Sequence, residues 1–188
     1  MRKETEGWSL DAKARIAGIF YLLTILFGAL AAVSKSGSTY ESIANLLATA
    51  AYLVVTLLFY SLFKPVNAIV SWIASLFSLA GCAISTLGAF HVRTIPIDPL
   101  GFFGAYCLLL GFLIFRSTFL PRFLGVLMAF AGCGWLTFAF PSFSIHLTPF
   151  NALPGLVGEG ALTLWLLAAG VKEQRGNEPA GPKPAAHS

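Results

Sequence analysis

Residues 100–140 read LGFFGAYCLLLGFLIFRSTFLPRFLGVLMAFAGCGWLTFAF, which is two apolar stretches separated by a short basic break. The first stretch covers residues 100–115 and the second covers residues 123–140, with Arg116 and Arg122 between them. A helix rises about 1.5 Å per residue, so roughly 20 apolar residues cross the roughly 30 Å of hydrocarbon in a bilayer. The stretches are close to that length and predict two membrane-spanning helices joined by a tight connection.

Apolar stretches of this kind recur along the whole chain of 188 residues. Hydrophobic residues make up 57% of the sequence and charged residues only 11%, and the mean hydropathy is +0.79. A soluble domain carries about 25% charged residues, so lipid must surround most of this chain. The sequence predicts an all-α polytopic membrane protein, a compact bundle of six transmembrane helices. The predicted spans are residues 16–33, 42–63, 67–90, 100–115, 123–140 and 155–171.

The distribution of Lys and Arg predicts the orientation, because basic residues remain on the cytoplasmic side of a membrane. Six spans put ten basic residues on one side and only Lys35 and Arg93 on the other. Both termini are therefore expected in the cytoplasm (N-in, C-in) of a bacterial plasma (inner) membrane. Residues 1–12 are expected to form a cytoplasmic segment, 13–172 the transmembrane domain, and 173–188 a disordered cytoplasmic tail. The ten are Arg2, Lys3, Lys13, Arg15, Lys64, Arg116, Arg122, Lys172, Arg175 and Lys183.

Several function classes lack the residues that they need. The net charge of +4 comes from basic residues that flank apolar stretches and form no patch with aromatics, so nucleic acid is not an expected partner. Cys82, Cys107 and Cys133 lie in three different spans without metal or redox spacing, which is typical of small buried side chains. The sequence has no phosphate-binding glycine loop, nucleophile elbow or HExxH helix. No cofactor is predicted.

Two imidazoles and two carboxylates on the predicted outer side are of the types that zinc and non-haem iron use. Their spacing matches no local motif, and a chain with three histidines always offers such combinations. No metal site is predicted. The four residues are His91, His146, Asp98 and Glu159.

Polar residues within two adjacent spans recur at helical spacing, so each span carries one polar face. Lipid offers these side chains no hydrogen bonds, which leaves two explanations open. The faces either pack two helices closely or border a shared polar cleft for a ligand. Gly104 with Gly111, and Gly125 with Gly132, likewise predict faces for close helix packing or for an oligomer. The polar faces comprise Asn45, Thr49, Tyr52, Thr56 and Tyr60, and then Ser71, Ser75, Ser78, Cys82 and Ser85.

Glu159 is the one acidic residue inside any apolar stretch. With a helix that starts at Pro154, its Cα lies about 7 Å inside the outer boundary. An intramembrane carboxyl is a candidate functional group whose partner should be identified. The expected partners lie on the outer side, where the apolar connection 141–154 lies in the headgroup region or covers Glu159 as a lid. The candidate ligand-binding residues are Glu159, His146, Arg93, His91, Asn45 and Tyr52.

Residues 107–117 read CLLLGFLIFRS and residues 119–125 read FLPRFLG. With Ala14–Gly18 near the start and Gly158-Glu159 near the end, this pattern resembles a bacterial family of small multi-span membrane proteins, domain of unknown function 4386. The resemblance extends from about Ala12 to Lys172. It implies the same membrane topology and a bacterial plasma membrane, and it implies no mechanism.

Three functions are compatible with these residues. The first is binding or transport of a small ligand or ion through an outward-facing polar pocket near Glu159. The second is a structural or accessory subunit whose polar faces are used in packing. The third is a membrane enzyme that acts on a lipid or small molecule and brings the histidines close to Glu159, and the sequence favours this one least. The expected partners are membrane lipids and a small-molecule ligand.

Overall fold

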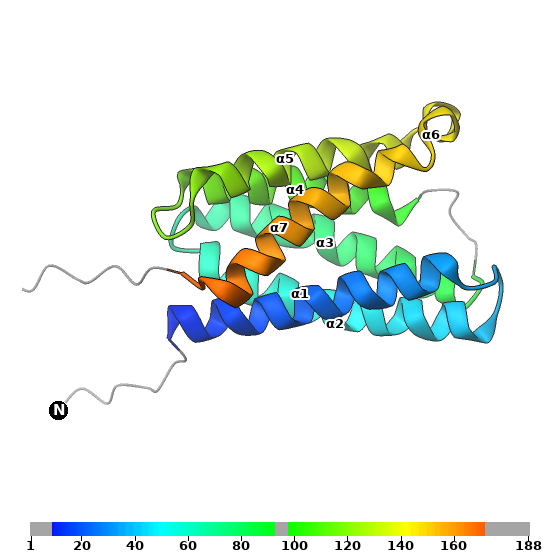
Figure 1. Cartoon of the computed structure of the whole chain (residues 1–188), viewed down its shortest axis with the longest axis horizontal. Helices are drawn as coiled ribbons and strands as arrows, with labels where there is room; N and C mark the ends of the chain where they lie inside the picture. Colours follow the sequence, from blue (N-terminus) through cyan, green and yellow to red (C-terminus); the bar gives the residue numbers. More distant parts are fainter. Residues whose placement is uncertain (1–8, 93–97, 172–188) are drawn as a thin grey trace, which may run out of the picture.

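The computed structural model describes residues 9–92 and 98–171, and six of its helices are long and apolar enough to cross a membrane (Figure 1). The described residues contain no strand, which confirms the predicted all-α bundle of six spans. The whole predicted tail 173–188, most of segment 1–12, and Arg93 lie outside the described residues. The elements are α1 (Leu10–Val33), α2 (Thr39–Phe63), α3 (Ala68–Ala89), α4 (Pro99–Arg116), α5 (Arg122–Leu136), η1 (Thr137–Ala139), α6 (Pro141–Leu147), η2 (Phe150–Ala152) and α7 (Leu153–Ala168).

Local side chains define where these helices begin. Ser38 accepts a hydrogen bond from the Glu41 amide, and the Glu41 carboxylate accepts one from the amide of Gly37. Asn67 and Asp98 cap α3 and α4 in the same way. Caps of this kind satisfy amides that have no partner within the helix.

The largest difference from the predicted spans is at α1, which begins at Leu10 rather than Ile16. The additional turns are polar, and they are stabilised by the Ser9 cap and by a 2.8 Å ion pair between Asp11 and Arg15. At the other end of the chain, α7 stops at Ala168, because Gly170 adopts a left-handed conformation (φ 63°).

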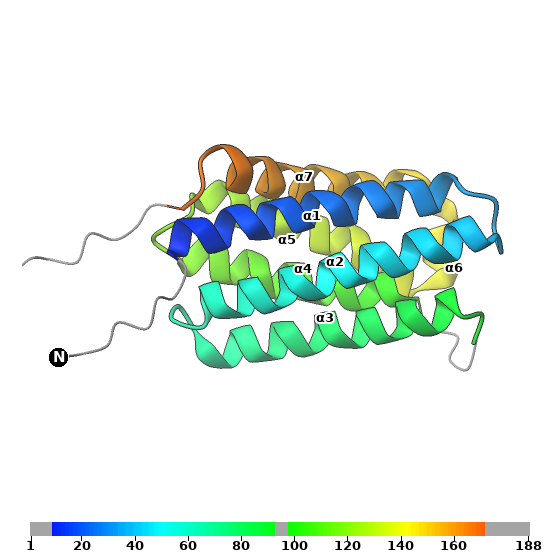
Figure 2. The ribbon, with the colours of Figure 1, turned by 90° about the horizontal axis from the view of Figure 1, so that it is seen from below.

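Successive long helices pack side by side, and α7 closes the ring by packing against both α5 and α1 (Figures 1 and 2). The two ends of the described chain therefore meet at one end of the bundle, here called the terminal end. The Val171 amide donates to Asp11 at 3.2 Å, and the Arg15 guanidinium donates to the Leu167 carbonyl at 2.9 Å. Six spans place Ser9 and Val171, the ends of the described chain, on the same side of a membrane.

Glycines set the closest helix contact, between α4 and α5. A β-carbon added at Gly111 would lie 2.7 Å from the Gly125 carbonyl oxygen, and one added at Gly125 would lie 2.7 Å from that of Gly111. Gly104 and Gly132 face each other in the same reciprocal manner. These faces are thus used within the chain, so an oligomer would need other surfaces.

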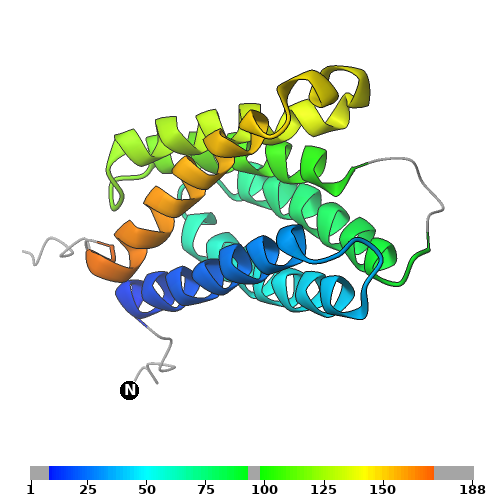
Figure 3. The same cartoon turned by 45° about the vertical axis from the view of Figure 1, so that its right-hand side comes forward.

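The connection between α5 and α7 is ordered at the opposite end of the bundle, here called the outer end (Figure 3). Its short helix α6 is held by Asn151, whose amide donates to Ser144 at 3.0 Å and to Thr137 at 3.3 Å. Phe143 and Ile145 are exposed. This arrangement fits the predicted location at the membrane surface.

The contact between α4 and α5 is expected to be sensitive to a single methyl group. Gly111→Ala should lower the free energy of unfolding by about 1–3 kcal/mol, because the added carbon meets backbone atoms that cannot move separately. Gly28→Ala is the matched control: nothing lies within 4 Å of its added carbon, and alanine favours the helix by up to about 1 kcal/mol. Thermal unfolding of the purified protein in detergent would measure both, and equal midpoints would contradict the glycine contact.

Candidate functional site

Glu159 lies in the interior of the bundle rather than near its outer rim. The span that contains it begins at Phe150, so its Cα is about 13 Å inside the outer end at 1.5 Å per residue. Its side chain is only 8% exposed. Gly155 and Gly158 precede it, and a β-carbon at Gly158 would clash with the Leu127 carbonyl of α5. The absence of side chains there brings α7 and α5 together beside the carboxyl.

Two donors reach the Glu159 carboxyl, and both reach the same oxygen. The Trp135 indole Nε1–H of α5 donates to Oε1 at 2.8 Å, and the Cys107 thiol of α4 donates to Oε1 at 3.4 Å. Both bonds come from neutral donors, so neither of them neutralises the charge of the carboxyl.

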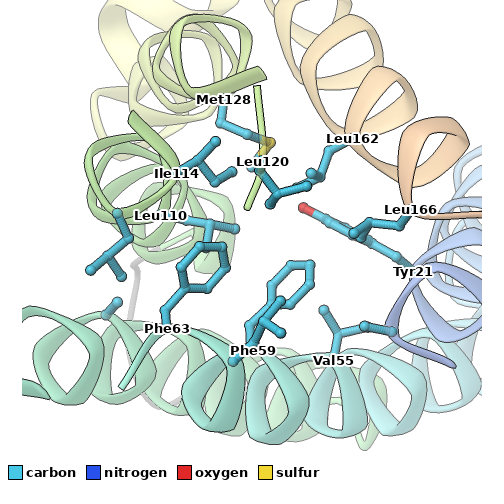
Figure 4. Close-up of a cluster of buried hydrophobic side chains, with 14 of the residues drawn as sticks. Tyr21, Val55, Phe59, Phe63, Leu110, Ile114, Leu120, Met128, Leu162 and Leu166 are labelled. Carbon is cyan, nitrogen blue, oxygen red and sulfur yellow. The ribbon is translucent and has the colours of Figure 1, made fainter. Parts of the chain in front are cut away.

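Three tyrosines from three helices surround this carboxyl. The ring of Tyr52 (α2) lies 5.8 Å from the rings of both Tyr21 (α1) and Tyr106 (α4), edge to face. Tyr21 lies close to Glu159, and Figure 4 shows its hydroxyl pointing into the bundle interior beside Leu162. All three rings are at most 5% exposed. Five of the six long helices thus contribute to one cluster, here called the core cluster: Tyr21, Tyr52, Tyr106, Cys107, Trp135 and Glu159.

The hydroxyls of Tyr21, Tyr52 and Tyr106 are buried and have no hydrogen-bond partner in the described structure. The Thr163 hydroxyl, one turn beyond Glu159 on α7, is also buried without a hydrogen-bond partner. A buried polar group without a partner costs about 1–3 kcal/mol. A packing role alone would be fulfilled by phenylalanine at each tyrosine without that cost. The core cluster consequently has the donors and acceptors of a binding site.

No basic side chain of the described residues approaches Glu159. The ion pair between Asp11 and Arg15 is the one that the described residues form, and it lies at the terminal end. The sequence has no Lys or Arg between Lys35 and Lys64 or between Arg122 and Lys172. The carboxyl can therefore be neutralised by a proton or by a positively charged ligand, but not by a cation of its own helix or of α2.

The outer-side partners predicted for Glu159 are wrong where they can be tested. His91 and His146 are exposed, and neither contacts the carboxyl. His91 closes α3 with a left-handed backbone (φ 57°), and His146 lies on α6. The helix η2 extends the span outward and leaves Glu159 too deep for either. Arg93 lies outside the described residues.

Of the remaining predicted site residues, Tyr52 joins the core cluster and Asn45 does not. Asn45 is half-buried near the outer end of α2, where its carbonyl accepts the Thr49 hydroxyl at 2.8 Å. Asp98 serves as a helix cap, and burial raises the pKa of its carboxyl while the Leu100 amide opposes that shift. Among the described residues, no three His, Cys, Asp or Glu side chains form a group that could hold a metal ion.

The polar faces of α2 and α3 serve close helix packing, which is one of the two uses that were left open. Thr56 and Ser78 form a 2.6 Å hydrogen bond between the helices, and several other hydroxyls bond to the carbonyl one turn earlier in their own helix. Nearer the terminal end, a small hollow of about 10 Å³ lies between these helices and α4. Tyr60, Ser71 and Ser75 border it, together with Tyr106.

Sequence analysis missed Tyr21, Tyr106, Cys107 and Trp135. Cysteine and tryptophan were treated as apolar residues of their spans, and the four residues come from three different helices. The position of each tyrosine along its helix was a signal that could have identified the cluster. Tyr21, Tyr52 and Tyr106 all lie near the middles of their helices, as does Glu159 in its span.

The fold and the buried carboxyl define a polytopic α-helical membrane protein with a polar core. The family described as domain of unknown function (DUF4386) matches residues 99–170. An uncharacterized protein of Archaeoglobus fulgidus is 31% identical over 119 residues, which are 60% of this chain and 73% of that protein. No solved structure matches the chain. The chain belongs to the DUF4386 family.

The hydrogen bond from Trp135 is expected to stabilise the core. Trp135→Phe leaves Glu159 Oε1 with the weak thiol donor alone and should lower the free energy of unfolding by about 1–3 kcal/mol. Trp72→Phe is the control, because Trp72 is 55% exposed on the lipid-facing side of α3 and a surface change costs about 0.5 kcal/mol or less. Thermal unfolding in detergent compares the two, and a larger loss for Trp72→Phe would contradict the role of Trp135.

Proposed function

We propose that this protein binds a small ligand at the core cluster, with the Glu159 carboxyl as the anchoring group. One observation carries the proposal. A carboxyl with no basic partner lies in the middle of a membrane-spanning bundle beside three buried tyrosine hydroxyls that have no hydrogen-bond partner. Polar groups at this depth are costly in a membrane and are typical of ligand and ion pathways.

A purely structural role accounts less well for the core cluster. The glycine faces of α4 and α5 and the pair Thr56–Ser78 already join the helices through close contacts and satisfied hydroxyls. The tyrosine hydroxyls add no such bond. An accessory subunit would gain stability if phenylalanine replaced these tyrosines, whereas a binding site needs their hydroxyls.

An enzymatic role based on the histidines has little support. It required His91 and His146 within a few ångströms of Glu159, and both side chains are exposed away from it. The core cluster pairs the Cys107 thiol with the Glu159 carboxyl at 3.4 Å but contains neither of the histidines that this role required. Binding, as the first step of transport or sensing, uses these groups without a chemical step.

The proposed orientation in the membrane is N-in and C-in, in a plasma membrane. It rests on the distribution of basic residues over the two ends of the bundle. The outer end has Lys35 as its one described Lys or Arg. The terminal end has five described basic residues: Lys13, Arg15, Lys64, Arg116 and Arg122.

Ligand binding at Glu159 predicts a difference in what copurifies with the protein. Native mass spectrometry of the wild type in detergent should detect a bound small molecule that Glu159→Gln loses, since the amide keeps the shape of the side chain and removes its charge. Glu41→Gln is the control, because Glu41 only caps α2 at the outer end. Identical bound species in the wild type and Glu159→Gln would refute a Glu159-dependent site.

The orientation predicts the location of the chain ends. A reporter that fluoresces only in the cytoplasm should be bright when fused after Ser188, and alkaline phosphatase fused there should be inactive. A phosphatase inserted after Gly37, in the turn between α1 and α2, should be active. The reverse pattern of reporter activities would show that the bundle has the opposite orientation in the membrane.

A further inference from the structure

We propose that the ligand of the core cluster is a small organic ammonium ion, an inference that rests on the proposed function. Its positive charge meets the Glu159 carboxylate, and its apolar groups and N–H donors meet the aromatic rings and hydroxyls around that carboxylate. Three features of the core cluster lead to this ligand class: its charge, its aromatic walls and its small number of oxygen ligands.

The charge of an ionised Glu159 favours a cationic ligand. A carboxylate buried in a low-dielectric interior is stable when it is paired with an opposite charge. The described basic residues all lie at the ends of the bundle, and Cys107 and Trp135 contribute neutral donors. A bound cation supplies the missing charge, and an anionic ligand would be repelled by the carboxylate.

The walls of the site favour an organic cation. Ammonium groups are attracted to the faces of Trp, Tyr and Phe rings within about 6 Å of the ring centre. The rings of Tyr21 and Tyr106 each lie 5.8 Å from the ring of Tyr52, the ring of Phe103 lies 4.7 Å from it, and the Trp135 indole bonds to the carboxyl. Aromatic rings are therefore the main apolar groups of the core cluster.

The oxygen ligands are too few for a hard metal ion. Calcium takes about 6–8 oxygen ligands and magnesium keeps an octahedral shell. The core cluster offers one carboxylate and three neutral phenol hydroxyls, and the described residues include no group of three acidic, His or Cys side chains. A primary ammonium needs only about three acceptors, and the carboxylate oxygen and tyrosine hydroxyls can supply that number.

Trp135 marks the direction of entry. It is the half-buried member of the core cluster, and the other members are buried. Its indole lies against Gly155, where no side chain intervenes, and its ring centre lies 5.9 Å from that of Phe138 near the outer end. An ammonium ion that enters from the outer half of the bundle therefore meets this ring before it meets Glu159.

The test is titration calorimetry of the full chain in detergent at neutral pH with n-propylammonium and, as the neutral isostere, n-propanol. The wild type should bind n-propylammonium at least tenfold more tightly than n-propanol. Glu159→Gln should reduce the affinity for n-propylammonium at least tenfold. Tyr52→Leu should also reduce it, and the lipid-facing control Trp72→Leu should not.

The comparison of the two probes on the wild type does not depend on the folding of any variant. Equal affinity for n-propylammonium and n-propanol, or no binding of n-propylammonium, would overturn the ammonium assignment. If a neutral or anionic molecule still copurified in a Glu159-dependent manner, the proposed site would stand with another ligand class. If, in addition, no molecule copurified in a Glu159-dependent manner, both the proposed site and the ammonium assignment would be refuted.

Discussion

Hydrocarbon forms no hydrogen bonds, and this constraint governs every polar group in the bundle. The backbone meets it through helices and caps. Most hydroxyls meet it by bonding to a carbonyl one turn earlier, as Ser75 bonds to Ser71, or by pairing across helices, as Thr56 pairs with Ser78. The core cluster stands apart from this pattern, because its tyrosine hydroxyls are buried without a bond to a carbonyl one turn earlier.

Close packing and the candidate site depend on the same glycines. Gly111 and Gly125 join α4 to α5, and Gly158 admits the backbone of α5 against α7. These contacts bring three helices near enough for Cys107 and Trp135 to reach one carboxyl oxygen. Bulkier residues at these positions would push the helices apart and move both donors away from the Glu159 carboxyl.

The core cluster also divides between two parts of the chain. The region that matches the DUF4386 family, residues 99–170, contributes Tyr106, Cys107, Trp135 and Glu159. The first two helices, outside that region, contribute Tyr21 and Tyr52. A ligand at Glu159 would contact both parts, so α1 and α2 are needed to complete the site as well as to close the ring.

Segment length, proline and basic residues were enough to predict six helices and their approximate limits, because crossing a bilayer is a property of each segment by itself. Glu159 was also identifiable, since an acidic residue in an apolar stretch is unusual wherever it points. Its partners depended on tertiary structure, because α7 packs against both α5 and α1 and turns the carboxyl toward the centre. That packing, together with the outward extension by η2, is why Tyr21, Cys107 and Trp135 surround Glu159 while His91 and His146 remain at the surface.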